Sequence, residues 1–160
     1  MENIVLNNKF ECPVVGIGTF MLSPADAEVS VREAHPYFTQ TELRKTLDKY
    51  DIKLMSWYPL GHGDKSLINE PVFAELGKKY GKSSAQIILR WHTQMGFVVI
   101  PGSKNVDHIK DNLDILDFKL TDEEMAEIAK LDQNERYYHR TDEQLIQFAG
   151  WKPDFEKLGM

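Results

Sequence analysis

Cysteine is nearly absent from this chain of 160 residues, in which Cys12 stands alone. An internal disulfide is therefore excluded, and no His, Glu or Cys pair has zinc-site spacing, so we expect no metal. Runs of Lys or Arg are also missing. The formal net charge of −6 argues against a nucleic-acid partner, which would require a basic face.

Long apolar segments are missing as well. No stretch approaches the roughly 20 residues of a membrane span, and residues 1–20 lack the basic start and apolar run of a signal peptide. We therefore expect a cytoplasmic protein without membrane contact. Hydrophobic residues at 42% and charged residues at 28% are typical of globular proteins, and at this length one domain over 1–160 is expected.

The first third of the chain predicts a hairpin and then a helix. Residues 5–19 read as two extended segments around a turn. Residues 25–34 carry Ala27, Val31 and Ala34 at helical spacing, which predicts a helix. Pro36 follows at once and cannot continue that helix, so the two segments are joined without turn residues.

From Thr41 onward the pattern alternates regularly between helices and strands. It predicts helices over 41–51, 69–80, 83–95, 105–114 and from 121 onward, with strands over 53–60 and 97–100. Strands that alternate with helices indicate a parallel sheet with crossover helices, an α/β fold.

The segment that follows the second of these strands has the chemistry of an anion site. A flexible Gly102 precedes Ser103, Lys104 and Asn105, and Asn105 caps the next helix. Backbone N–H groups at a helix start favour an anion, and Ser103 and Lys104 add a hydroxyl and a positive charge. Asp111 and Asn112 lie one to two turns further on, within reach of an adenine ring. The same spacing also fits an ordinary strand–loop–helix connection.

Two other segments carry aromatic or glycine residues at strand ends. Trp57 lies toward the carboxyl end of a predicted strand, where α/β barrels build their sites, and its ring suits stacking on a planar cofactor. Trp57 and Tyr58 also fit ordinary core and surface positions, and His62 fits a polar lining residue. The segment at Gly18 lacks the third glycine of a dinucleotide fingerprint, so a backbone passing close to a ligand is the better interpretation.

His35 and Tyr37 form a conceivable acid pair. Adjacent residues on an extended segment point to opposite faces, so we expect the two side chains to point apart and to carry no catalysis.

Together these segments resemble the aldo-keto reductase family, in particular its bacterial 2,5-diketo-gluconate reductase and prostaglandin F synthase-like branch. The motifs are Val14–Phe20, Glu33–Tyr37, Ser56–Gly61, Ile100–Ser103 and Asn112–Phe118. The resemblance implies a (β/α)8 TIM barrel that reduces aldehydes or ketones, small-molecule carbonyl substrates, with NADPH or NADH. It implies an incomplete barrel here, retaining an N-terminal hairpin, strand 1, the end of strand 6, strands 7 and 8 and their helices.

The resemblance also assigns site residues. Phe20 would line the substrate mouth, and cofactor contacts would fall on Gly18, Thr19, Trp57, Leu60, His62, Ser103, Lys104, Asn105, His108, Asp111 and Asn112. Many members carry Lys at the position of Gly102 and Arg at that of His108. Those cations meet the 2′-phosphate of NADPH, so a weakened or partial site with less preference for NADPH over NADH is expected.

The family's catalytic Asp, Tyr, Lys and His have no counterpart here, so no catalytic residue is assigned. Residues 31–34 fit the first barrel helix, while Glu33 onward fits the end of the sixth strand. This overlap predicts a deletion junction near residues 32–35, natural or engineered. We expect an inactive or very weak reductase, or alternatively a non-enzymatic module that self-associates, for example as a homodimer, through exposed sheet edges.

Overall fold

The computed structural model describes residues 3–5, 11–13, 29–61, 65–103, 105–137, 141–143 and 146, with side chains from Glu33 onward. Two short strands, β1 (Asn3–Val5) and β2 (Glu11–Pro13), pair antiparallel as a hairpin. Residues 14–20, which include the predicted first barrel strand, lie outside the described residues.

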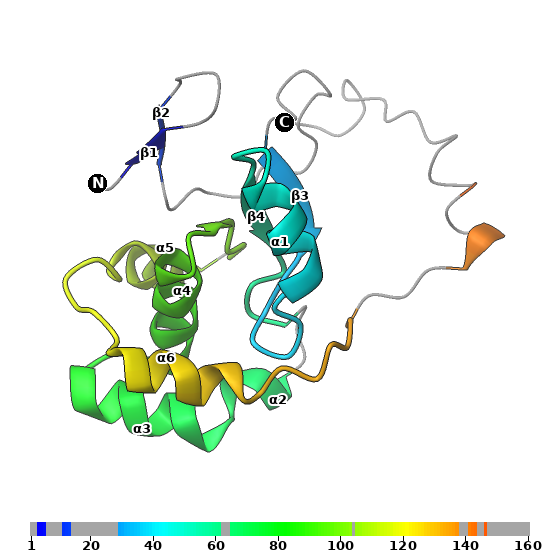
Figure 1. The fold of residues 1–160 in the computed structure, drawn as a ribbon. Helices are drawn as coiled ribbons and strands as arrows, with labels where there is room; N and C mark the ends of the chain where they lie inside the picture. Colours follow the sequence, from blue (N-terminus) through cyan, green and yellow to red (C-terminus); the bar gives the residue numbers. More distant parts are fainter. Residues whose placement is uncertain are drawn as a thin grey trace, which may run out of the picture.

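A parallel sheet of three strands organises the described part of the chain (Figure 1). Its order is β3 (Val29–Glu33), β4 (Lys53–Trp57) and β5 (Val98–Val99). Val29 is aligned with Lys53 and Glu33 with Trp57, while Met55 is aligned with Val98. The predicted parallel α/β arrangement is confirmed. The two predicted strands are shorter than expected, at 53–57 and 98–99.

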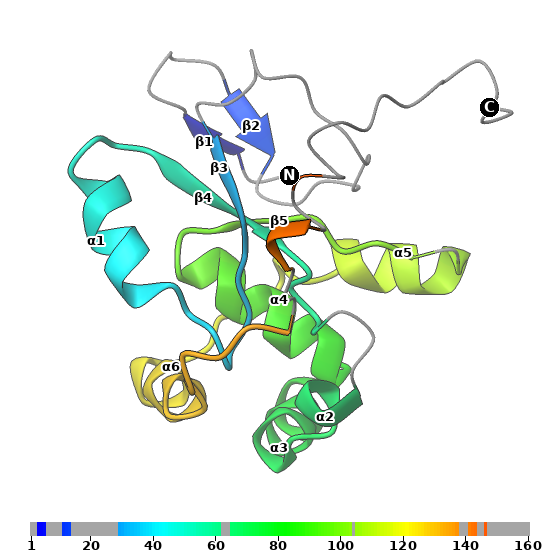
Figure 2. The ribbon, with the colours of Figure 1, turned by 90° about the vertical axis from the view of Figure 1, so that its right-hand side faces the viewer.

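Helices connect the strands in crossover fashion. α1 (Thr41–Asp48) joins β3 to β4, and α2 (Lys65–Ile68), α3 (Pro71–Tyr80) and α4 (Ser84–Gln94) join β4 to β5. α5 (Val106–Leu113) and α6 (Asp122–Ala129) follow. Figure 2 shows α1 and α5 on opposite sides of the sheet, with α3 and α6 lying together at one end.

The prediction of a helix over 25–34 is wrong for the residues described, because 29–33 form β3. The run Val29-Ser30-Val31 has β-branched residues at alternate positions, a pattern that favours a strand. Parallel pairing with β4 over five aligned residues satisfies backbone groups of both strands, and a helix here would leave that edge of β4 unpaired. The strand then runs straight into the turn at His35, so the expected abrupt join between helix and extended segment is absent.

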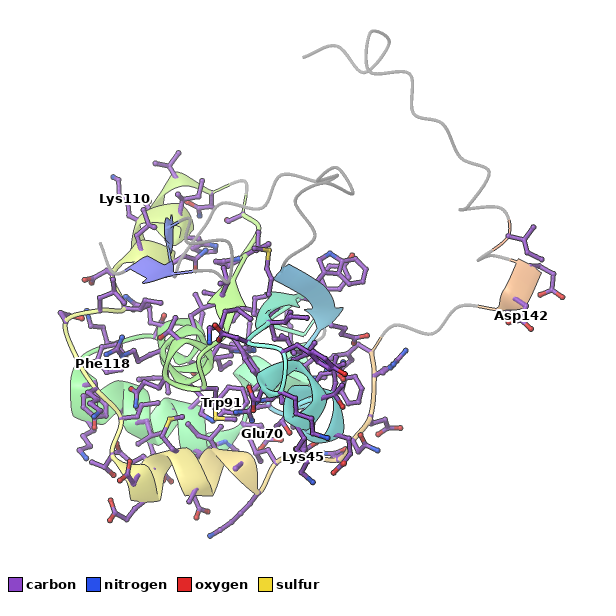
Figure 3. All side chains as sticks on the ribbon, turned by 45° about the horizontal axis from the view of Figure 1, so that its top comes forward. Lys45, Glu70, Trp91, Lys110, Phe118 and Asp142 are labelled. Atoms are coloured by element: carbon purple, nitrogen blue, oxygen red, sulfur yellow. The ribbon has the colours of Figure 1, made fainter. Side chains whose placement is uncertain are left out.

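The helical layer contains the main core. Its fully buried members come from α2, α3, α4, α6 and the segment before α6: Leu67, Phe73, Ile87, Ile88, Trp91, Leu120 and Ile128. Figure 3 shows Trp91 in the interior between the helices. α3 can turn sharply into α4 because Gly77 passes close to the next turn. A Cβ at Gly77 would lie 2.5 Å from the Lys82 carbonyl oxygen.

The two faces of the sheet bury different side chains. Leu54 packs with Leu47 of α1 and with Phe97, whereas Met55 packs with Val98 and Ile100. The consecutive burial of Leu54, Met55 and Ser56 is that of a strand covered on both faces, and Trp57 is half-buried at the carboxyl end.

Within the described residues, no helix combines the length and apolar content that crossing a membrane requires.

Candidate dinucleotide site

The carboxyl ends of the three parallel strands meet at one edge of the sheet. β3 ends at Glu33, β4 at Trp57 and β5 at Val99, and neighbouring strands are in register. Loops at this edge form the ligand sites of barrels and open α/β sheets. Parallel pairing of β4 with β5 therefore brings the Trp57 segment and the loop after Val99 to the same edge.

Trp57 and Tyr58 form a close, tilted ring pair where β4 ends. Their ring centroids are 3.9 Å apart and their planes differ by 34°. Tyr58 adopts the left-handed conformation, with φ at 55°, and its carbonyl oxygen accepts a hydrogen bond from the Gly61 N–H at 3.0 Å. This turn ends the strand three residues before the predicted end. Leu60 is half-buried and packs against Leu89, Val99 and Ile115.

The loop after β5 leads directly into α5. Pro101 is buried and Gly102 is exposed, and a side chain added at Gly102 would meet open space. Ser103 Oγ accepts the Asn105 N–H at 3.1 Å, and the Asn105 side chain caps α5 by accepting the Asp107 N–H at 2.9 Å. The predicted cap at Asn105 is confirmed.

The start of α5 offers a mixed electrostatic environment to an anion. Unpaired N–H groups of the first turn and the helix dipole attract negative charge, while the exposed Asp107 opposes it. Lys110 (Figure 3) has its Nζ 3.7 Å from Asp107 Oδ1 and offsets part of the negative charge of that carboxylate. The predicted anion site therefore keeps its hydroxyl and backbone donors but has a carboxylate beside them.

Asn112 is the buried member of the predicted adenosine set. The residue is 7% exposed and lies on α5. His108 and Asp111 are exposed on the same helix. Of the other predicted contacts, Gly18, Thr19, Phe20, His62 and Lys104 lie outside the described residues.

A second polar group at this edge was not predicted as a unit. The chain after α6 runs back past the end of β3 (Figure 2), and the Tyr137 N–H donates to Glu33 Oε1 at 2.6 Å. His35 Nε2 lies 3.2 Å from the same carboxylate oxygen, and the Tyr137 ring lies 4.5 Å from the His35 ring. Tyr137 is about a hundred residues from its partners, so no local pattern could have paired them.

The expectation that His35 and Tyr37 point apart is wrong. Residues 35–38 form a tight turn, with the Phe38 N–H donating to the His35 carbonyl oxygen at 2.8 Å. The turn brings the two rings to 6.4 Å, edge to face. Pro36 fixes its own φ and favours such a turn, so the segment is not extended as the sequence prediction assumed.

Neither ring of this turn is prepared for proton transfer. The Tyr37 hydroxyl donates to Glu70, and burial together with this bond raises the pKa of Tyr37 well above its ordinary value of 10.0. Burial lowers the pKa of His35 despite the Glu33 carboxylate beside it. We therefore assign this group to packing.

A tyrosine, a lysine and a carboxylate do meet elsewhere, between α3 and α6. Tyr80 and Lys79 both donate to Glu124, each at 2.6 Å. Lys79 and Tyr80 lie at the end of α3 and Glu124 lies in the first turn of α6, so none of the three lies on a strand. In the described part of the chain, no group of three His, Cys, Asp or Glu side chains is arranged to hold a metal.

Comparison with known proteins gives one consistent result. Residues 24–133 match the sequence model of the aldo/keto reductase family. The chain is 45% identical over 114 residues to aldo-keto reductase family 1 member D1 of Mus musculus, covering 66% of this chain and 35% of the mouse protein. It is 43% identical over 104 residues to methylglyoxal reductase DkgA of Escherichia coli, covering 65% of this chain and 38% of the bacterial protein.

Solved structures agree. An aldo-keto reductase of Bombyx mori, determined in complex with NADP, superposes with a TM-score of 0.65 at 32% identity. The match covers 69% of this chain and 39% of the insect protein. The described fold is therefore a partial, TIM-barrel-like fragment, and the chain spans little more than a third of the length of the curated relatives.

Proposed function

Because this chain belongs to the aldo/keto reductase family, we propose that it binds a nicotinamide dinucleotide along the carboxyl edge of its sheet. The observation that carries this proposal is the parallel pairing of β4 with β5, which brings the Trp57 segment and the loop after Val99 to one edge of the sheet. Asn112, which is 7% exposed on α5, hydrogen-bonds the edge of the adenine. Ser103, Asn105, His108 and Asp111 surround the adenosine and phosphate groups. Trp57 stacks on the nicotinamide, and Leu60 lines the path between the two ends.

The remaining contacts complete the proposed site. Gly18 and Thr19 approach the nicotinamide ribose, Phe20 lines the substrate mouth, and His62 and Lys104 lie along the phosphates. A bound reduced nicotinamide supplies a hydride to a carbonyl carbon. The chain's own residues bind and orient that ring, and they hold the phosphates at the start of α5.

We propose that carbonyl reduction by this chain is absent or very weak. Hydride transfer requires a proton donor at the carbonyl oxygen, with a pKa suited to the working pH. Tyr37 is a poor donor because its hydroxyl is engaged by Glu70 and its pKa is raised. We further propose that a deletion junction lies near residues 32–35 and that the family's catalytic Asp, Tyr, Lys and His are missing.

A second candidate is a self-associating module without enzymatic activity. Within the described strands, β3 and β5 each have a single partner strand, so each leaves one edge open. Val106 and Leu113, two turns apart on α5, are 64% and 41% exposed. A homodimer formed through these features is the specific form of this candidate.

Cofactor binding is tested by calorimetric titration of the purified chain with NADPH and NADH. The variant Asn112→Ala should weaken NADPH binding about three- to tenfold, the range expected for one lost neutral hydrogen bond. Asn69→Ala is the matched control, because Asn69 is exposed and follows α2 instead of lying on α5. Equal affinity of wild type and Asn112→Ala for NADPH would overturn the assignment of Asn112.

The same titrations compare NADPH with NADH in the wild type. A hundredfold preference for NADPH over NADH would overturn the expected loss of discrimination between the two cofactors.

Activity is tested in the same preparation by following the absorbance of NADPH with methylglyoxal as a probe carbonyl. We expect no oxidation above the rate without protein. Turnover that depends on both protein and carbonyl would contradict the inactive form of the proposal and leave cofactor binding intact.

A further inference from the structure

Tyr58 occupies an unfavourable backbone conformation at the end of β4. Its φ of 55° lies in the left-handed region, which bulky side chains rarely adopt. Pro59 follows directly, and a proline disfavours helical conformations in the residue before it. Strain of this kind persists only where surrounding contacts hold it, and it is concentrated at functional sites.

The ring of Trp57 is one contact that holds Tyr58 in place. Neighbouring residues on a regular strand point to opposite faces and cannot stack. The left-handed turn at Tyr58 reverses that direction and brings the two centroids to 3.9 Å. The Gly61 N–H closes the turn on the Tyr58 carbonyl oxygen, and Gly61 itself has φ at 85°. The local backbone is therefore arranged around the ring pair.

We propose that the Tyr58 ring takes the place of a planar ligand ring. It covers the face of the Trp57 indole on which the nicotinamide would stack. Both side chains are half-buried at the carboxyl edge, so a ligand that approaches the indole along this edge meets the Tyr58 ring. This inference rests on the proposed function for the identity of the ligand. Tyr58 itself contacts no cofactor and acts through Trp57.

Displacement of Tyr58 has a predictable consequence for affinity. A ligand that stacks on Trp57 can bind only those molecules in which the Tyr58 ring has left the indole. Its apparent affinity is therefore reduced in proportion to the fraction of such molecules. The stacking energy of an aromatic pair corresponds to about a two- to tenfold effect. Removing the ring should therefore tighten binding of a ligand that stacks on Trp57, and leave a ligand without a stacking ring unaffected.

The experiment compares Tyr58→Asn with Tyr58→Phe in the full chain. Asparagine tolerates the left-handed conformation and removes the ring, so the turn survives, whereas phenylalanine keeps the ring. Each variant is titrated with NADPH and with adenosine 2′,5′-bisphosphate, which carries the adenosine half without the nicotinamide. We expect Tyr58→Asn to bind NADPH about two- to tenfold tighter than wild type. Tyr58→Phe should bind NADPH with nearly the wild-type affinity. The affinity for the bisphosphate should be the same in all three proteins.

The outcomes separate this inference from the proposed function. If the bisphosphate binds but Tyr58→Asn leaves NADPH affinity unchanged or weaker, the role of Tyr58 is overturned and the dinucleotide site stands. If Tyr58→Asn tightens the bisphosphate as much as NADPH, the effect is not competition for the indole, and the inference fails. If neither nucleotide binds any of the three proteins, both proposals fail.

Discussion

At the scale of single residues, burial decides the behaviour of His92. Its ring is fully buried on α4, with Nδ1 at 2.8 Å from the Ile88 carbonyl oxygen and Nε2 at 3.1 Å from that of Ala34. Burial lowers the pKa of His92 from its ordinary value of 6.5 to about 4, although both carbonyl oxygens favour the charged ring. The ring is therefore neutral near pH 7 and donates a hydrogen bond to one of the two carbonyl oxygens. Its two contacts link α4 to the end of β3.

This pKa predicts a loss of stability in mild acid. Above pH 6.5 the ring is neutral in both folded and unfolded chains, and as the pH falls toward 4 only the unfolded chain gains the proton. The free energy of unfolding should fall by up to about 1.4 kcal/mol per pH unit in this window from His92 alone. Urea unfolding of wild type and His92→Gln across this pH range measures it.

The quantity compared between wild type and His92→Gln is the slope of the free energy of unfolding against pH. A loss of stability in the variant that is the same at every pH does not change this slope. The lowered pKa of His35 acts in the same direction and remains in both proteins. Identical slopes for the two proteins would show that His92 does not titrate as described.

At the scale of elements, side-chain caps fix where helices begin. Ser83 accepts the Gln86 N–H at 3.3 Å, and the Gln86 side chain accepts the Ser83 N–H at 3.0 Å. Thr121 and Glu124 repeat this arrangement on α6. Gln86 also donates to the Asp114 carbonyl oxygen at 2.8 Å, which ties α4 to the chain after α5. Both caps were predicted from sequence, because all of their bonds join residues three apart.

Removal of the Ser83 cap should be measurable. Ser83→Ala leaves the Gln86 N–H without its acceptor and should lower the free energy of unfolding by about 1 kcal/mol. Thr46→Ala is the matched control, since Thr46 is exposed within α1 and its hydroxyl lies 3.5 Å from the Glu42 carbonyl oxygen. Urea denaturation of both variants tests this; equal stability of Ser83→Ala and wild type would refute the cap's contribution.

At the scale of the whole molecule, the described sheet is open. β3 and β5 each pair with β4 alone within the described residues, and the chain covers 35% and 38% of the length of the two curated relatives compared. Closed barrels have no free edges, whereas open edges and exposed apolar side chains favour association. The exposed Val106 and Leu113 lie on α5, the helix that follows the edge strand β5.

We therefore expect concentration-dependent self-association. Light scattering over a dilution series should show species heavier than the 18.5 kDa chain, and the double variant Val106→Lys with Leu113→Lys should shift them toward the monomer. Tyr50→Lys is the control, because Tyr50 is equally exposed but follows α1 on the other side of the sheet. A monomer at all concentrations would contradict the self-association candidate.

The sequence by itself determined what depends on neighbours along the chain. The caps at Ser83, Asn105 and Thr121 and the order of helices and strands after Thr41 follow from local hydrogen bonding and periodicity. The local sequence at Val29–Glu33 fits either a helix or a strand, and the tertiary structure decided for the strand, because its backbone partners lie 24 residues away on β4. The tertiary structure likewise decided the contact of Tyr137 with Glu33, because a pairing across 104 positions leaves no local pattern to read.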